Sequence, residues 1–300
     1  MKNGLKILLS SLVSLTFMLS VSSVGFADGD NNVTQSQKDL IMEKYKMSQA
    51  FVDDLSEEQL KEYMDNIDQL VGVEKKEEYY RYDYDMSDPL NPKRVNVEKT
   101  TKEVATLSLM QDSYPPLSRA ASCGIKPGYD CYKTSWLKLE TWVYKYGTND
   151  GSVQARFEWL KQKPTRTDED IFAIGLNANM SPTVGTEKGN YKFDYFMPNG
   201  SIITGETKIL SNPRRGAGGY AYRINLDDGV QSVNHRGWMT YKFSPNLSTL
   251  IVADGYSHYA HQDQTWSISP SISIPAGGGL ELSSEKEFMI VTGHAQRKPW

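Results

Sequence analysis

The sequence predicts a mainly β protein: an antiparallel β-sandwich or a flattened, jelly-roll-like barrel, preceded by a small N-terminal helical hairpin. The first observation is that residues 123–300 form short segments in which apolar and polar side chains alternate. The second is that Gly, Pro, Asn and Asp divide these segments at regular spacing, with no helical period between them. The third is an earlier stretch, residues 34–72, whose apolar side chains recur at helical spacing. Such a series of short strands pairs antiparallel in sandwiches and barrels.

The first 27 residues are typical of a secretory signal peptide. Lys2 and Lys6 precede an uncharged apolar run over residues 7–26, and Gly25-Phe26-Ala27 is a small-x-small cleavage pattern. The run is close to the ~20 residues that span a bilayer, so an uncleaved anchor is the alternative. Its many Ser and Thr residues favour cleavage after Ala27. The sequence therefore predicts a secreted protein, extracellular or associated with the cell wall.

Three parts are expected after this signal. Residues 28–72 are expected to form a helical appendage or a pro-segment, because Ser56-Glu57-Glu58-Gln59 is a capping box within an apolar stripe of helical period. Residues 73–121 are expected to be a connector broken by prolines, and residues 122–300 the antiparallel β domain. The connector contains possible strands at Tyr79–Tyr84, Val95–Val97 and Val104–Leu109.

Ten strands are expected in the β domain, at residues 136–146, 153–160, 171–176, 191–197, 201–210, 220–226, 237–243, 249–258, 265–274 and 287–292. Asn199-Gly200 and Asp228-Gly229 are expected to be hairpin turns, because both residue pairs tolerate positive φ. Pro270 cannot donate to a ladder, so the strand at 265–274 is expected at a sheet edge. Its alternation of apolar residues with Ser also fits a membrane-inserting hairpin, which is the alternative.

The charge of the chain argues against nucleic-acid binding. The formal net charge is −4, with −8 on residues 28–103 and +2 from there to Trp300. Phosphate binding needs clustered Lys and Arg, which neither part contains. An acidic segment before a slightly basic domain also fits a pro-segment that is held partly by charge.

The two cysteines, Cys123 and Cys131, are expected to form one disulfide. Seven residues separate them, and Gly124, Pro127 and Gly128 make that interval a tight turn. Nearby cysteines in an exported chain commonly pair in this way. A redox or metal pair is the alternative, but the spacing is not C-x-x-C and no His lies close in the sequence.

The strand expected at residues 136–146 has two different faces. Leu137, Leu139, Thr141 and Val143 point to one side and suit a core, since side chains alternate along a strand. The other side carries what we call the aromatic row: Trp136, Lys138, Glu140, Trp142, Tyr144 and Tyr146. Flat rings interleaved with hydrogen-bonding groups are what a sugar-stacking ligand platform needs. The same pattern fits packing against another layer, and both interpretations stay open.

The sequence contains no catalytic, metal or cofactor motif. Glu140 and Glu158 lie on successive expected strands and could face each other as a glycosidase pair, but nothing fixes their separation. His258 and His261 lie near Asp254, yet residues three apart on a strand face opposite ways, which disfavours a shared metal. We therefore expect no metal site, no cofactor and no catalytic residue.

These observations predict a secreted or cell-surface β-sandwich protein that binds a glycan or a protein ligand and is not an enzyme. The expected partner is a cell-wall or environmental glycan, or a surface protein. Two alternatives are a secreted glycan-active hydrolase on a jelly-roll scaffold and a pore-forming or membrane-active protein, although membrane insertion is not favoured. An open carboxylate pair in an aromatic cleft would favour the hydrolase. A poorly covered hairpin at residues 264–284 would favour the pore former.

Overall fold

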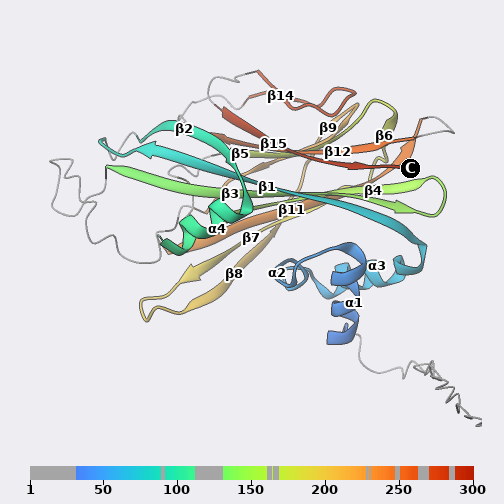
Figure 1. Ribbon diagram of the computed structural model, residues 1–300, viewed down its shortest axis with the longest axis horizontal. Coiled ribbons are helices and arrows are strands. Elements are labelled where there is room, and N and C mark those ends of the chain that lie inside the picture. Colours follow the sequence, from blue (N-terminus) through green and yellow to red (C-terminus); the bar gives the residue numbers. More distant parts are fainter. Residues whose placement is uncertain are drawn as a thin grey trace, which may run out of the picture. The chain divides into compact units, whose positions relative to one another are not determined.

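The structure is a computed structural model that describes residues 32–88, 92–111, 131–160, 164, 169–227, 229, 231–246, 251–262, 270–283 and 288–300. Within it, Val33 to Trp300 form one compact unit. Two antiparallel sheets lie face to face, and three short α-helices and a 3-10 helix precede the first strand (Figure 1). The predicted mainly β sandwich with a small N-terminal helical segment is confirmed.

The larger sheet has the strand order β2-β1-β3-β4-β11-β7-β8, with β6 paired to β11, and the smaller sheet has the order β15-β12-β5-β10-β9. The strands of the larger sheet are β1 (Leu70–Asp85), β2 (Lys93–Thr100), β3 (Tyr132–Tyr146), β4 (Asp150–Leu160), β6 (Met180–Pro182), β7 (Lys188–Phe196), β8 (Ile202–Ile209) and β11 (Ser232–Pro245). Those of the smaller sheet are β5 (Asp170–Leu176), β9 (Arg214–Gly216), β10 (Gly219–Ile224), β12 (Ala253–Gln262) and β15 (Phe288–Arg297). A short third pair joins β13 (Ile272–Ser273) and β14 (Glu281–Leu282).

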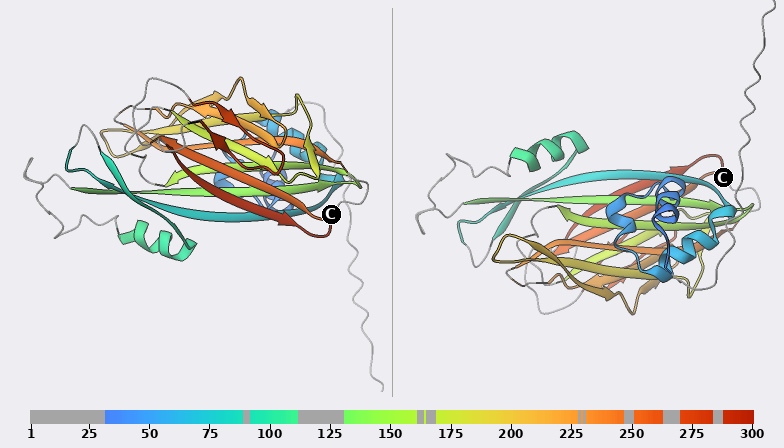
Figure 2. Two further views of the ribbon diagram at one scale, coloured as in Figure 1. Left: turned by 90° about the horizontal axis from the view of Figure 1, so that it is seen from above. Right: turned by 90° about the horizontal axis from the view of Figure 1, so that it is seen from below.

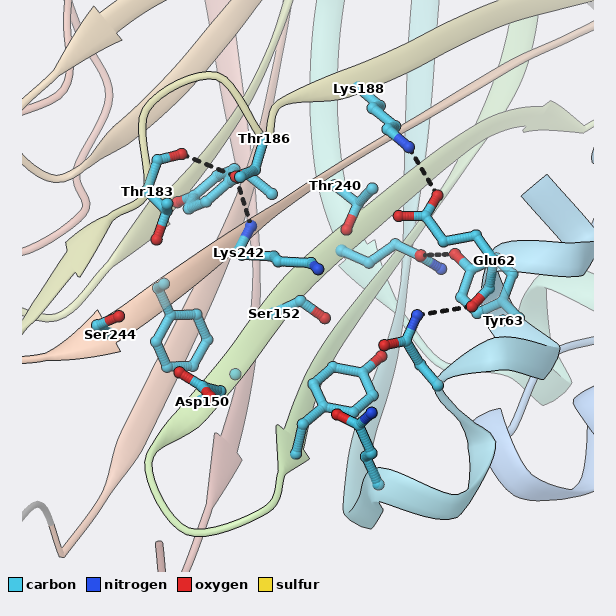
Figure 3. Close-up of a pocket in the computed structure, with 17 residues that line it drawn as sticks. Glu62, Tyr63, Asp150, Ser152, Thr183, Thr186, Lys188, Thr240, Lys242 and Ser244 are labelled. Carbon is cyan, nitrogen blue, oxygen red and sulfur yellow. Dashed lines mark hydrogen bonds and ion pairs between the residues drawn. The ribbon is translucent and has the colours of Figure 1, made fainter. Parts of the chain in front are cut away.

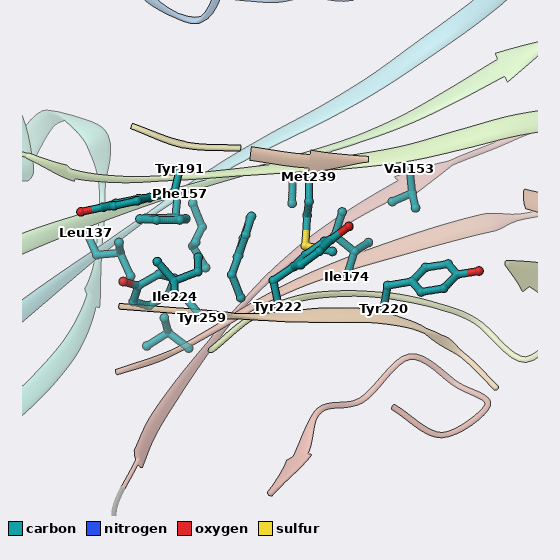
Figure 4. Packing of buried hydrophobic residues seen from close by; sticks show 14 of the residues in the cluster. Leu137, Val153, Phe157, Ile174, Tyr191, Tyr220, Tyr222, Ile224, Met239 and Tyr259 are labelled. Carbon is teal, nitrogen blue, oxygen red and sulfur yellow. The ribbon is translucent and has the colours of Figure 1, made fainter. Parts of the chain in front are cut away.

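The main core lies between the two sheets and follows from the two-residue period of the strands. On β4, Val153, Ala155 and Phe157 are fully buried, and Phe157 meets Phe172 and Tyr259 of the smaller sheet. The ring centroids of Phe157 and Tyr259 are 4.6 Å apart. Figure 4 shows side chains of both sheets filling the space between them. Burying a side chain of this size contributes about 1.5–3 kcal/mol, so these inner faces hold the sandwich together.

The helices before β1 cover part of the outer face of the larger sheet (Figure 2). They are α1 (Gln35–Tyr45), α2 (Gln49–Val52), α3 (Glu57–Asp65) and the 3-10 helix η1 (Ile67–Gln69), and we call residues 34–69 the helical cap. Capping boxes start α1 at Thr34 and α3 at Ser56, and the second confirms the sequence prediction. The predicted helical stripe runs too far, because β1 already begins at Leu70.

The segment at residues 73–121, expected as a connector with possible strands, contributes two strands to the sandwich. Strands β1 and β2 belong to the larger sheet, and β1 pairs with β3 from Leu70 to Asp85. The segment Val104–Leu109, expected as a strand, lies instead in the helix α4 (Lys102–Gln111). Ala105, Leu107 and Leu109 in this segment are strong helix formers. Thr101 also accepts a hydrogen bond from the backbone N–H of Val104, as an N-cap residue does.

The two predicted hairpin turns have different outcomes. The turn at Asn199-Gly200 joins the paired strands β7 and β8, and Gly200 adopts a φ of +83° there. Gly229 lies between β10 in the smaller sheet and β11 in the larger sheet, so a hairpin at Asp228-Gly229 is wrong. Asp228 itself lies outside the described residues. A turn signal marks a reversal of the chain, but it does not say to which sheet the next strand belongs.

The described part of the hairpin expected at residues 264–284 is covered by the smaller sheet. Ile274, Leu280 and Leu282 are buried in one cluster with Ile171 and Ala173. Residues 263–269 lie outside the described ranges, and β13 contains only two residues of the strand expected at 265–274. In the described part of the chain, no helix is both long and apolar enough to cross a membrane.

Two predictions fall outside the described residues. Residues 1–27 are among those that the structure does not describe, so signal cleavage stays a prediction. Cys123 is also outside, and the Cys123–Cys131 disulfide therefore stays a prediction too. Removal of residues 28–72 as a pro-segment is likewise an expectation from sequence.

Candidate functional site

The aromatic row lies on the outer face of the larger sheet, but the helical cap and the helix α4 pack against three of its rings. Trp142 is completely buried and packs against Phe51 of the cap, with ring centroids 5.5 Å apart. Tyr144 packs in the same cluster, and Trp136 is buried near Ala105 of α4. These three rings are therefore packing residues in this structure and do not form an exposed platform. Alternation along a strand predicts the face of a side chain, but it does not show what covers that face.

The charged members of the row, Lys138 and Glu140, belong to a buried ionic network. The Glu140 carboxylate lies 2.8 Å from the Lys75 ammonium, 3.1 Å from that of Lys138 and 3.2 Å from the Arg156 guanidinium. Burial alone would raise the pKa of Glu140, but these three cations outweigh it and hold the pKa below its ordinary value. Glu140 therefore stays ionised and is unsuited to act as a general acid.

Glu140 and Glu158 do lie on adjacent strands, yet they do not face each other across an open cleft. Arg156 Nη1 donates to both carboxylates, over 3.2 Å to Glu140 and 2.6 Å to Glu158. The Glu140 side chain is 1% exposed. A glycosidase pair needs access to substrate on both sides of the scissile bond, and this arrangement does not provide it.

The same network fixes the helical cap to the sheet through Asp54. Its carboxylate accepts hydrogen bonds from Arg236 over 2.7 and 2.8 Å and from Arg156 over 3.2 Å, and it lies 3.1 Å from the Lys192 ammonium. Burial would raise the pKa of Asp54, but the hydrogen bonds from Arg236 and the three cationic charges together lower it. A side chain of the cap thus supplies the anion that compensates cations on three strands of the sheet.

A pocket of about 360 Å³ opens where the cap meets the ends of β3, β4 and β11 (Figure 3). Its floor is the outer face of two paired strands, on which Lys242 lies opposite Ser152 and Thr240 lies opposite Gln154. Because side chains alternate, the residues between them face the core instead. The side chains on the outer face of the floor are Asp150, Ser152 and Gln154 of β4 and Thr240, Lys242 and Ser244 of β11, and Gly151, Tyr241 and Phe243 of the same strands also line the pocket.

Three segments form the walls of the pocket. The cap contributes the first wall, where Tyr63 Oη donates to Gln154 Oε1. The segment after β6 and the start of β7 form the second, and its Lys188 makes an ion pair of 2.7 Å with Glu62 of the cap. Tyr146, the last residue of β3, also lines the pocket. The wall residues are Glu62, Tyr63, Asn66, Gln69, Tyr146, Thr183, Thr186 and Lys188.

The lining of the pocket suits a ligand with many hydroxyl groups. Hydroxyl, amide, carboxylate and ammonium groups converge on it beside tyrosine rings, and a few placed polar groups with aromatic surface are typical of small-ligand sites. Burial raises the pKa of Tyr146 to about 12, so its hydroxyl stays protonated, and Ser152 and Tyr45 are its hydrogen-bonding partners in the protein. The volume is near the lower end of the ~300–1,000 Å³ range of such sites.

Tyr146 is the member of the predicted aromatic row that the structure places in this pocket. The alternation of polar with apolar residues at 150–154 and 240–244 signals a polar outer face, but sequence reasoning did not single out these residues. Their convergence depends on the pairing of β4 with β11, which are far apart in the chain.

The histidines are held by hydrogen-bonding partners in the sandwich. His261 Nδ1 lies 2.8 Å from Asp170, and His294 Nε2 lies 2.9 Å from Asp254. His258 lies 2.7 Å from the backbone oxygen of Gly278. Within the described ranges, no group of three or more His, Cys, Asp or Glu side chains is placed to hold a metal ion.

Comparisons with known proteins give fold-level similarity at most. No family model and no curated protein matches the sequence. Among solved structures, the pilus backbone RrgB of Streptococcus pneumoniae aligns at 10% identity with a TM-score of 0.28, over 50% of this chain and 44% of that one. The T6 backbone pilin of Streptococcus pyogenes aligns at 7% identity with a TM-score of 0.31, over 74% and 63%.

A third solved structure, from the Fap1 fimbriae of Streptococcus parasanguinis, aligns at 11% identity with a TM-score of 0.24, over 53% of this chain and 80% of that one. The chain thus spans less than two thirds of the two pilins that it matches. These chains come from pili and fimbriae, but at such scores the likeness carries no argument about function.

Proposed function

We propose that this chain is a non-enzymatic glycan-binding protein of the cell exterior and that its ligand occupies the pocket between the helical cap and strands β4 and β11. The observation that carries the proposal is the polar floor of Asp150, Ser152, Thr240 and Lys242 beside the ring of Tyr146. Sugars present hydroxyl groups that need hydrogen-bonding partners, and faces of C–H groups that pack on aromatic rings.

The location outside the cell rests on the sequence of residues 1–27, which is typical of a signal peptide. A secreted protein encounters cell-wall and environmental glycans, so this location fits the ligand class that the pocket suits. The predicted Cys123–Cys131 disulfide fits an oxidising compartment in the same way.

The hydrolase and the pore former, the two alternative functions, have less support from the residues that would carry them. The carboxylates of Glu140 and Glu158 are both tied to Arg156, which leaves no free acid for hydrolysis at that place. The described part of the hairpin at residues 264–284 packs its apolar side chains against the smaller sheet. A pore former needs such side chains available for lipid.

The proposal is tested by binding to insoluble glycans and by a variant of the pocket floor. The purified protein is mixed with peptidoglycan, cellulose and chitin, and retention is compared with that of the D150A variant. Asp150 is exposed at the start of β4, so its replacement is not expected to disturb the fold. Losing a charge-assisted hydrogen bond should weaken binding roughly tenfold or more.

The matched control is E98A, which removes an exposed acidic side chain on β2 that does not line the pocket. It should bind like the wild type. The proposal is wrong if the wild type is retained on none of these glycans and binds no soluble oligosaccharide. Retention of D150A and E98A to the same extent as the wild type would place the binding site elsewhere.

A further inference from the structure

We propose that the ligand of the pocket is an acidic saccharide and that Lys242 recognises its carboxylate; this inference rests on the proposed glycan-binding function. The charged side chains that line the pocket are Glu62, Asp150, Lys188 and Lys242. Glu62 and Lys188 neutralise each other across the gap between α3 and β7, at 2.7 Å. The charges that a ligand meets are therefore those of Lys242 and Asp150.

Lys242 has an available ammonium group. Lys242 is exposed, and among the residues that the structure describes its side chain has no hydrogen-bond or ion-pair partner. The buried cations of the neighbouring network differ in this respect, since Arg156 and Arg236 are each held by two or more carboxylates. An unpaired ammonium that lines a pocket is available to an anionic group of a ligand, and a hydrogen bond between charged partners is stronger than a neutral one.

The backbone at Lys242 is held in place, which fixes where its side chain begins. The backbone N–H of Lys242 donates to Thr186 Oγ1 over 3.0 Å, and Thr186 Oγ1 donates to the backbone oxygen of Thr183 over 2.7 Å. Strand pairing sets Lys242 opposite Ser152. Figure 3 shows the Lys242 side chain extending across the floor toward Ser152. A carboxylate seated there would meet an ammonium and a hydroxyl together.

Asp150 would bind the hydroxyl groups of the same saccharide. It lies on the same face of β4 as Ser152, one diagonal step from Lys242, a relation that places two residues about 7–8 Å apart. Its carboxylate has no side-chain partner within the described part of the chain and can accept hydrogen bonds from sugar hydroxyls. A ligand must therefore offer an anionic group and hydroxyl donors on one small unit. A uronic acid does so, and Ser152, Thr240 and Ser244 supply further partners for its ring hydroxyls.

The experiment measures affinity for matched acidic and neutral sugars by calorimetry. The probes are galacturonate and glucuronate oligosaccharides, with galactose and glucose oligosaccharides of the same length and linkage as neutral counterparts. Wild-type protein should bind the acidic sugars roughly tenfold or more tightly than the neutral ones, as expected for one added charge-assisted hydrogen bond. This preference should shrink between about 0.1 M and 1 M salt, where the Debye length falls from ~10 Å to ~3 Å.

The decisive variant is K242M, which keeps an aliphatic side chain on β11 and removes the charge. Its affinity for acidic sugars should fall roughly tenfold or more, to the level of the neutral sugars, while any loss of affinity for neutral sugars should be smaller, because they lack the charged partner of Lys242. The control is K61M, which removes an exposed lysine from α3 that does not line the pocket and should keep the preference.

Each failure has a separate meaning. Equal binding of acidic and neutral sugars by the wild type, or an unchanged preference in K242M, refutes the role of Lys242 and leaves the glycan-binding proposal standing. Absence of binding to either class refutes the glycan-binding proposal itself. Binding of a short zwitterionic peptide in place of any saccharide would refute both.

Discussion

Replacing Asp54 should detach the helical cap from the sheet, because this single carboxylate balances cations on three strands. The change is D54A. Asp54 has a side chain that is 7% exposed, and it is in contact with Arg236, Arg156 and Lys192 at distances between 2.7 and 3.2 Å. Removing one partner of a buried ion pair leaves the other charges uncompensated in a poorly solvated place.

The expected loss of unfolding free energy is about 3 kcal/mol, at the lower end of the ~3–5 kcal/mol range for breaking a buried pair. The lower end applies because the cations keep other partners. Arg156 retains Glu140 and Glu158, and Arg236 retains Asp194. The D54N variant keeps the shape and some hydrogen bonding, so it should lose less than D54A.

Urea unfolding followed by tryptophan fluorescence measures this loss, since Trp142 lies directly beneath the cap. Limited proteolysis gives a second readout, because local opening of the cap exposes residues 34–69 without unfolding the sandwich. The control is D53A. Asp53 is exposed and accepts a hydrogen bond from Gln49, so its loss should stay within about 0.5 kcal/mol.

The contribution of Asp54 should also depend on pH in a defined direction. The pKa of Asp54 is lowered in the folded protein, so its stabilising effect is fully present above the unfolded-state value of about 3.9. The effect is lost as the pH falls through the lower folded-state pKa. A loss of less than about 1 kcal/mol in D54A, with a cap that is cut no faster than that of D53A, would show that Asp54 does not hold the cap on the sheet.

Two further predictions concern packing and the cysteines. The variant W142A should lose about 3–5 kcal/mol of unfolding free energy in urea, as large-to-small aromatic changes do. The control Y132A, at an exposed site, should change the unfolding free energy little. A small loss in W142A would mean that the cap does not pack on this ring. The Cys123–Cys131 disulfide should leave no alkylatable thiol in mass spectrometry before reduction, and its loss should cost about 2–3 kcal/mol. Two free thiols would contradict that pairing.

The sequence by itself determined the class of the fold and the faces of its strands. Period-two alternation places Leu137, Leu139 and Val143 in the core and the aromatic row on the opposite side, as the structure has them. The capping box at Ser56 likewise predicts the start of α3. These features depend on neighbours within a few residues, so a local pattern is sufficient to predict them.

The tertiary structure alone decided what covers each face and which side chains meet. The sequence could not show that the cap buries Trp142, because that contact joins residues far apart in the chain. For the same reason it could not predict the pocket, which needs the pairing of Ser152 with Lys242 and a wall from the cap. Alternation specifies the side of a sheet, whereas a binding site depends on long-range pairing and on the layer above it, and neither is encoded in any short segment.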